Sequence, residues 1–361
     1  MDNKNNLMYI MSGDVKTVEF NEAFEFNILD EARAPIYIIN KGNIKKWIEE
    51  RAVYSIRPNS RALKSVQGLS KLAADYDTAM KVDAAVITDN YWIRREQDIR
   101  QYQDIVFTKN DFFTLALYRD ITALSSRPGR SPELTNIGTQ EKGWKLENGE
   151  WWLYKNEPVK EVVSEYIAYR LGKAMGYRMA EYEIVDGGEF IKTKDFTQGK
   201  YNLQHIDSIV SDHREGDKIV PDDDYKYNYL TLKEIDEKLA EEYISICILD
   251  AICENYDRHT KNYGLLTDSN TGKIISLAPN YDNNNSILAN YGITADHLGG
   301  LLQHFIRFVK ENRIPLKLPS LSKKTVEQIV EETYALVNHD FDQKLITNFI
   351  ISGYNKLKAV N

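Results

Sequence analysis

The chain has 361 residues, of which 42% are hydrophobic and 28% charged, and its formal net charge is −8 at pH 7. These values are typical of a globular protein with room for two or three domains. The acidic balance argues against direct nucleic-acid binding. No segment reaches the roughly 20 apolar residues that cross a bilayer, and no signal-peptide pattern opens the chain, so we expect a cytoplasmic protein without a membrane partner.

Residues 1–125 are predicted to form an N-terminal accessory region of mixed α/β character. The apolar runs Met8–Met11 and Ile36–Ile39 favour strands, because both are rich in β-favouring residues and bounded by turn residues. Apolar residues at helical spacing predict three helices, over residues 44–52, 62–74 and 110–121.

Residues 126–200 are predicted to form a small β-rich lobe. The boundary is placed in 125–134, where proline, glycine and serine interrupt the periodicity. Asn148-Gly149 lies between two apolar runs and predicts a hairpin over 143–154. A helix and a second hairpin follow, over 158–176 and 181–193.

Residues 201–361 are predicted to be mainly helical. A long apolar helix over 234–255 contains Cys247 and Cys253, whose number and spacing favour buried thiols over metal ligands. Three amphipathic helices follow, over 298–310, 323–338 and 342–358. The fold class that we expect is α+β: a two-lobed, protein-kinase-like fold with an additional N-terminal α/β region.

The most informative motif is the polar run 255–262 followed by the segment 279–282. Asp257 heads the loop, Asn262 comes five positions later, and Asp282 follows an intervening hairpin that returns the chain towards Asn262. Phosphoryl transfer from ATP needs a carboxylate to accept the hydroxyl proton, and an amide plus a carboxylate to hold magnesium. We therefore predict Asp257 as catalytic base and Asn262 and Asp282 as Mg²⁺ ligands. The alternative is that Asp257 only caps backbone amides at the end of a helix.

Further residues fit nucleotide binding. Lys155 ends a predicted strand and is placed to neutralise ATP phosphates, with Glu165 on the next helix as its partner, although any surface strand can end in lysine. The loop before that hairpin could fold over the phosphates through its backbone amides, although it matches no standard glycine-rich motif. The candidate binding residues in this loop are Gly138, Thr139, Gln140 and Lys142.

Arg258 and His259 lie inside the catalytic loop. We expect both to brace the loop, and we include His259 among the candidate nucleotide-binding residues. A general-base role for His259 is an alternative.

Together these residues resemble the HipA-like serine/threonine kinases, a bacterial branch of the protein/lipid kinase fold. The resemblance covers roughly residues 130–355. It rests on the segments 255–263, 277–282, 137–142 and 164–166. It implies the roles given above for Asp257, Asn262, Asp282 and Lys155, and it places the adenine against Lys194 and Phe196.

The chain departs from the family pattern at three places. Asp195 precedes Phe196 where the family has arginine, and the loop carries Thr135 and Thr139 where family members can autophosphorylate a serine. The first 125 residues do not read as the small barrel of the founding toxin. They resemble the leader of related kinases from Firmicutes-type bacteria.

The resemblance implies a kinase that transfers the γ-phosphate of ATP to a serine or threonine hydroxyl on a protein substrate. It also implies an antitoxin-like partner and autophosphorylation of the loop. For that reaction the loop offers Thr135 and Thr139 in place of the family's serine. Two alternatives stay open. One is a lipid or small-molecule kinase of the same fold, and the other is a non-catalytic nucleotide-binding regulator or toxin-module component.

Overall fold

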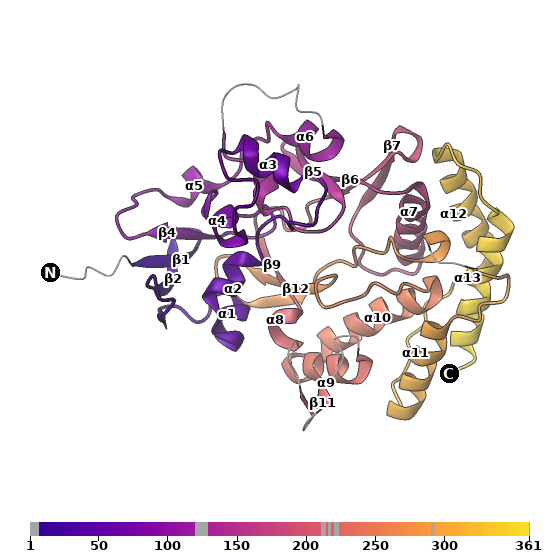
Figure 1. The fold of residues 1–361 in the computed structure, drawn as a ribbon. Coiled ribbons are helices and arrows are strands. Elements are labelled where there is room, and N and C mark those ends of the chain that lie inside the picture. The colour runs from indigo at the N-terminus through magenta and orange to yellow at the C-terminus, as the bar shows by residue number, and fades with distance from the viewer. Residues whose placement is uncertain are drawn as a thin grey trace. The chain divides into compact units, whose positions relative to one another are not determined.

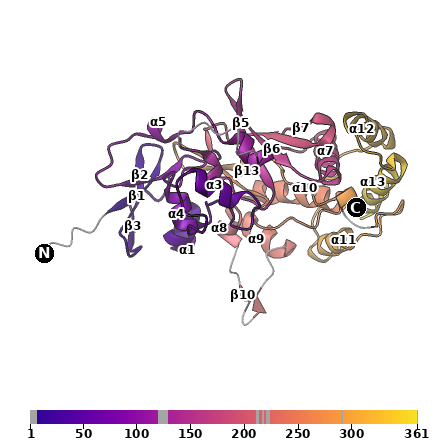
Figure 2. The same cartoon turned by 45° about the horizontal axis from the view of Figure 1, so that its top comes forward.

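The computed structural model describes residues 7–119, 129–210, 214–215, 218–219, 224–289 and 292–360. The predicted boundary after residue 125 lies outside these ranges. The chain forms two compact units, each assembled from separate segments (Figure 1, Figure 2). The first comprises Met1–Asn156, Thr193–Gln204 and Leu265–Ile275, and the second comprises Glu157–Lys192, His205–Gly264 and Ser276–Asn361. The architecture is mixed α/β with several sheets.

The first unit contains a four-stranded sheet of order β3-β2-β1-β4, whose neighbouring strands are antiparallel. Its strands are β1 (Met8–Ser12), β2 (Val15–Phe20), β3 (Phe26–Ile28) and β4 (Tyr91–Arg95). Strand β1 is buried along its whole length, because Met8 and Ile10 face one hydrophobic core while Tyr9 and Met11 face another. This burial on both faces explains its uninterrupted apolar run.

The strand predicted over Ile36–Ile39 is wrong, because these residues begin helix α1 (Ile36–Lys41). Pro35 precedes the first turn, and Gly42 ends the helix in a left-handed conformation (φ 63°). Proline at the start and glycine just past the end are helix signals. The β-favouring composition misled the prediction, since Tyr37 and Ile38 are buried in the core on one face of the sheet.

Six further short helices of the first unit precede strand β5. Asn43 caps the helix that begins at Ile44, because its Oδ1 accepts from the Lys46 N–H at 3.0 Å. The helices predicted over 62–74 and 110–121 are shorter than expected within the described residues. The six elements are α2 (Ile44–Glu49), α3 (Ser60–Val66), α4 (Asp75–Met80), α5 (Tyr102–Ile105), α6 (Phe113–Tyr118) and the 3-10 helix η1 (Pro132–Thr135).

The hairpin predicted over 143–154 is confirmed as β5 (Glu141–Glu147) and β6 (Glu150–Asn156). Asn148 and Gly149 both have positive φ, 52° and 83°, as the tight turn requires. In the ladder Lys142 lies directly opposite Lys155, so the two side chains project from the same face. A three-stranded sheet has the order β13-β12-β9, formed by β9 (Tyr201–His205), β12 (Gly264–Asp268) and β13 (Ile274–Leu277).

The second unit begins with helix α7 (Val159–Ala174), as predicted. The second predicted hairpin corresponds to β7 (Tyr182–Val185) and β8 (Phe190–Lys194), which are neighbours in their sheet and are joined by the 3-10 helix η2 (Asp186–Gly188). The helix predicted over 234–255 is α10 (Glu237–Cys253). It does not continue from α9 (Tyr225–Ile235), because Asp236 has extended dihedral angles and caps α10 by accepting from the Lys238 N–H.

The three predicted C-terminal helices are confirmed as α11 (Gly300–Asn312), α12 (Lys323–Leu336) and α13 (Gln343–Lys358). Helices α12 and α13 lie side by side in both views (Figure 1, Figure 2). Both cysteines are buried free thiols. Among the described residues, no helix is both long and apolar enough to span a membrane. The remaining short elements are α8 (Asp207–Val210), η3 (Ile287–Ala289), β10 (Arg214–Glu215) and β11 (Lys218–Ile219).

Candidate active site

Helix α10 delivers the polar loop that carries Asp257. Most of the helix is buried, so its position is fixed by packing on several sides. It ends at Glu254, which takes a left-handed conformation (φ 54°) and turns the chain sharply. The Glu254 carboxylate then accepts from the Leu301 N–H of α11 at 2.8 Å. The start of the loop is therefore held by both α10 and α11.

Asp257 is partly buried, and its backbone is fixed inside the loop. Its carbonyl oxygen accepts from the His259 N–H at 2.9 Å and from Asn262 Nδ2 at 2.7 Å. Burial raises the pKa of the Asp257 carboxyl, and the charge of Asp282 raises it further, while His259, Arg258 and Asn262 act in the opposite direction. The Asp282 contribution means that the two predicted functional acids lie within electrostatic reach of each other.

Asn262 is buried and lies beside Asp257. Because its Nδ2 donates to the Asp257 carbonyl, the amide oxygen is left to accept a hydrogen bond or to bind a cation. Amide oxygens and carboxylates are the donors that magnesium prefers. The placement of Asn262 therefore fits the predicted role of a metal ligand.

Asp282 has a left-handed backbone, with φ 60°. Residues with side chains adopt this conformation rarely, and aspartate and asparagine tolerate it better than most. The Asp282 N–H donates to Tyr182 Oη at 3.1 Å, and the next residue, Asn283, donates its N–H to Glu165 Oε1 at 2.8 Å. Two hydrogen bonds thus hold the turn around the second predicted metal ligand.

Arg258 connects the loop of Asn262 to the segment of Asp282. Its Nη1 donates to the Asn262 carbonyl at 2.7 Å and to the Tyr281 carbonyl at 2.6 Å. Its Nε and Nη2 bind the two oxygens of Asp250, on α10, at 2.9 and 3.0 Å. Further acceptors of Nη2 are the side-chain oxygens of Asn280 and Asn283. The expectation that Arg258 braces the loop matches these contacts.

The charges around Arg258 keep it protonated. Burial acts to lower its pKa, but Asp250, and with it Asp282 and Glu165, outweigh burial and raise the pKa above the ordinary value for arginine. A permanent buried cation therefore lies behind the two segments that carry Asn262 and Asp282.

Glu165 lies on α7 and is fully buried. Its Oε1 accepts from both the backbone N–H and the Nδ2 of Asn283, at 2.8 and 3.2 Å. The predicted pairing with Lys155 stays a prediction. The contact with Asn283 was not predicted, and it gives Glu165 a role in holding the segment after Asp282.

Apart from His259, the other predicted nucleotide-binding residues belong to the first unit. Thr139 and Gln140 are exposed, and Gly138 has a positive φ of 117° that favours glycine. Lys142 lies in strand β5 and not in the loop as predicted, and its Nζ packs so closely on Gly138 that a Cβ there would collide with it. Lys155 is buried and lies opposite Lys142 in the ladder, so two cations share one face at the base of the loop.

The predicted adenine segment follows strand β8. Lys194 Nζ pairs with Glu150 Oε1 at 2.5 Å. Asp195 is buried, and its carboxylate accepts from the backbone N–H groups of Thr197 and Gln198, at 2.9 and 3.1 Å, which makes a turn after Phe196. The aspartate that departs from the family pattern therefore shapes the local backbone.

His259 is exposed, and its Nδ1 accepts from the Lys261 N–H at 3.2 Å. This bond stabilises the loop, as expected of a brace. It leaves Nε2 for other contacts.

A divalent cation fits the chemistry of Asp257, Asn262 and Asp282. Among the residues that the structure describes, no group of three or more histidine, cysteine, aspartate or glutamate side chains forms a metal site. The predicted set contains two acids and one amide, so it differs in kind from such a cluster. Hard oxygen donors from one or two acids, with phosphates completing the shell, are typical of Mg²⁺ in phosphotransfer sites.

A family model described as the HipA-like C-terminal domain matches residues 133–340, which is more than half of the chain. The chain belongs to the HipA-like family. The resemblance inferred from the loop motifs is thereby confirmed. No curated protein matches the chain.

Solved structures similar to it include those of a HipA protein and of a kinase. HipA of Shewanella oneidensis MR-1, solved in a toxin–antitoxin complex with HipB and operator DNA, has 14% identity and a TM-score of 0.53, over 98% of this chain and 96% of that chain. The Helicobacter pylori proinflammatory kinase CtkA has 19% identity and a TM-score of 0.38, over 60% of this HipA-like chain and 90% of that chain. The Shewanella match supports a common mixed α/β fold.

Several residues of the site were missed by sequence reasoning. Asp250 is an acid inside the otherwise apolar end of α10, residues 246–253, a pattern that signals a buried ion pair and could have been noticed. Tyr182 and Asn283 carry no such signal, because their contacts with Asp282 and Glu165 depend on tertiary packing.

Proposed function

We propose that this HipA-like protein is an ATP- and Mg²⁺-dependent kinase that transfers the γ-phosphate to a serine or threonine hydroxyl on a protein substrate. The proposal includes a two-lobed, kinase-like fold and an antitoxin-like partner, since the Shewanella HipA was solved together with HipB. The observation that carries it is the Arg258 network. One buried guanidinium binds the backbone of both segments that bear the candidate metal ligands, next to an acid whose pKa is raised.

In this proposal each residue has one role. Asp257 accepts the proton of the attacking hydroxyl, and its raised pKa brings it nearer to the value that suits a base at neutral pH. Asn262 and Asp282 hold Mg²⁺, which when bound neutralises phosphate charge. Lys155 and Lys142 attract the phosphates. Arg258 keeps the two ligand segments in place, so catalysis depends on positioning and electrostatics.

The test compares two variants with the wild-type protein. Asp257→Asn should lower phosphate transfer by about 10²–10⁴-fold, the usual contribution of a general base, while nucleotide affinity changes little. Asp282→Ala should remove the Mg²⁺-dependent part of the thermal stabilisation by ATP. Transfer is measured with radiolabelled ATP and a bacterial lysate, and the modified residue is identified by mass spectrometry.

Asp340→Asn is the matched control, because Asp340 only accepts from Tyr334 Oη at an exposed site. It should behave like the wild type in both assays. Wild-type transfer rates in Asp257→Asn would refute the base assignment. Binding of ATP by the wild-type protein without any transfer would favour a non-catalytic regulator.

A further inference from the structure

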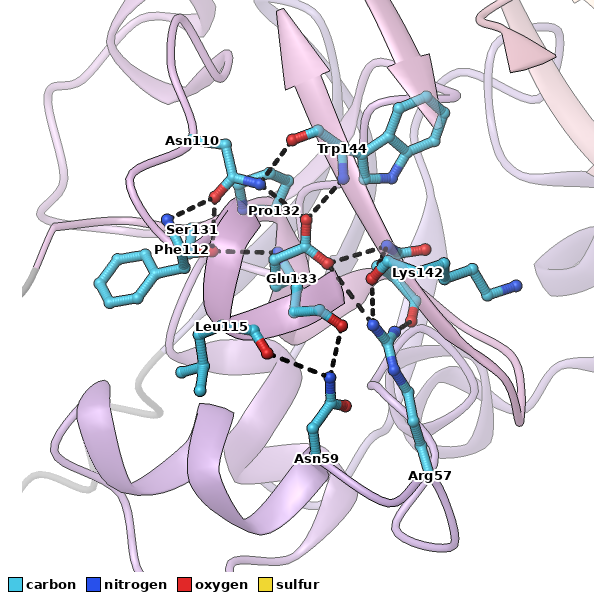
Figure 3. Close-up of polar contacts among 12 residues, drawn as sticks. Arg57, Asn59, Asn110, Phe112, Leu115, Ser131, Pro132, Glu133, Lys142 and Trp144 are labelled. Atoms are coloured by element: carbon cyan, nitrogen blue, oxygen red, sulfur yellow. Dashed lines mark hydrogen bonds and ion pairs between the residues drawn. The ribbon is translucent and has the colours of Figure 1, made fainter. Parts of the chain in front are cut away.

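A buried polar network in the first unit has no role in the proposed mechanism (Figure 3). Its centre is Glu133 in η1, which is fully buried. Glu133 Oε1 accepts from Asn110 Nδ2 and from the Trp144 N–H, both at 2.7 Å, and Oε2 accepts from Asn136 Nδ2 at 2.9 Å. Arg57 Nη2 lies 3.8 Å from Glu133 Oε2 and forms an ion pair with it. The acid is thus satisfied mainly by groups other than Arg57.

The closer contacts of Arg57 are with the glycine-containing loop. Its Nη1 donates to the Asn136 carbonyl at 3.0 Å, and its Nη2 donates to the Lys142 carbonyl. These two carbonyls flank residues 137–141, which comprise the loop and the first residue of β5. A planar guanidinium holds two acceptors at a fixed separation, which a flexible lysine amine cannot do. A residue about 80 positions earlier in the chain therefore closes the base of this loop.

The closure also arranges the cations under the loop. Figure 3 shows the Lys142 carbonyl directed towards Arg57 while the Lys142 amine points away from it. That amine packs against Gly138, and Lys142 lies opposite Lys155 in the ladder. Lys142 thus accepts a hydrogen bond from Arg57 with its backbone carbonyl, while its side chain places a cation below the loop.

A role limited to neutralising Glu133 does not explain this geometry. Two of the donors of Arg57 are used on the loop ends, whereas the carboxylate is 3.8 Å away and has three other donors. Burying the Arg57 guanidinium without partners would be costly. The ion pair with Glu133 and the two loop carbonyls together therefore keep it in place.

We propose that Arg57 is a positioning residue for the nucleotide phosphates. Through Arg57 the N-terminal region completes the phosphate-binding loop. The inference rests on the proposed function, because the loop binds phosphates only if the protein binds ATP.

The experiment uses the full-length protein with Arg57→Met and the milder Arg57→Lys. Amide hydrogen exchange of residues 137–141 without nucleotide reports the loop itself, and the Kd for ATP together with kcat and KM reports its function. We expect faster loop exchange, and ATP binding weakened by about tenfold in Arg57→Met, with a smaller effect in Arg57→Lys. KM for the protein acceptor should not change.

Arg51→Met and Arg51→Lys are the matched controls. Arg51 is an arginine of the N-terminal region whose side chain is 10% exposed; it pairs with a buried acid, Asp89, and donates to the Ala84 carbonyl. Its variants should lower stability without a selective change in loop exchange or ATP affinity. Equal effects of the Arg57 and Arg51 variants on both readouts would overturn the inference.

The two proposals fail in different ways. If the wild-type protein binds no ATP, the proposed function fails and with it the role in phosphate binding, while loop exchange still reports whether Arg57 closes the loop. If the wild type binds ATP and the Arg57 variants bind it equally well, only the inference fails.

Discussion

Asp257 illustrates how single charges adjust the site. Burial and the neighbouring Asp282 raise its pKa, whereas the electrostatic interaction with His259 lowers it. A base works only when it is ionised, so turnover should fall as pH decreases through the raised pKa of Asp257. The acidic limb of the pH profile should therefore lie above the ordinary range of an aspartate.

The variant His259→Asn tests this balance. Asparagine keeps an acceptor for the Lys261 N–H and removes the imidazole. Losing the imidazole, whose interaction lowers the pKa of Asp257, moves the acidic limb to higher pH, while turnover near the optimum should fall by less than about tenfold. A loss of about 10²–10⁴-fold would instead indicate that His259 is the general base. The measurement is the pH dependence of kcat for ATP turnover.

At the scale of elements, the site depends on how the loop after α10 is tied to the segment that carries Asp282. Arg258 follows α10, and its side chain and that of Asp250 are only 9% and 3% exposed. The hairpin returns the chain from Asn262 to Tyr281, and Arg258 binds both ends of that excursion. Removing one partner of such a buried pair leaves an uncompensated charge or unpaired acceptors.

Arg258→Lys should therefore lower the free energy of unfolding by about 3 kcal/mol and reduce transfer activity, because one amine cannot replace the guanidinium fork. The matched control is Arg170→Lys, since Arg170 and Glu332 form a pair whose side chains are 30% and 41% exposed. That variant should cost about 0–1 kcal/mol. Urea unfolding measures both, and equal losses would contradict a special role for Arg258.

At the scale of the whole molecule, the N-terminal region shares its core with the hairpin that carries Lys142 and Lys155. One hydrophobic cluster combines Tyr9 and Leu63 with Leu134, and Trp151 packs against it. Leu134 is fully buried there. The N-terminal region is therefore part of the structure that supports the phosphate-binding candidates.

A chain shortened to residues 126–361 should lose cooperative unfolding, because each exposed core side chain such as Leu134 costs about 1.5–3 kcal/mol and Glu133 loses its cation. A chain that lacks only residues 1–6 is the control, since it keeps β1 and both cores. Near-ultraviolet circular dichroism during urea unfolding distinguishes the two. A sharp, wild-type transition in the shorter chain would show that the N-terminal region is dispensable for folding.

The sequence by itself determined the family, the β5–β6 hairpin at Asn148-Gly149, and the long helices, because turn chemistry and helical periodicity are local properties. It also identified Asp257, Asn262 and Asp282 as candidates from their order along the chain. The prediction from local β propensity was wrong at Ile36–Ile39, because these residues form a helix whose buried side chains pack against the sheet. Only the tertiary structure revealed the hydrogen bonds of Arg258 with Tyr281, of Glu165 with Asn283, and of Arg57 with the loop ends. These contacts join segments that are far apart along the chain, so no local sequence pattern predicts them.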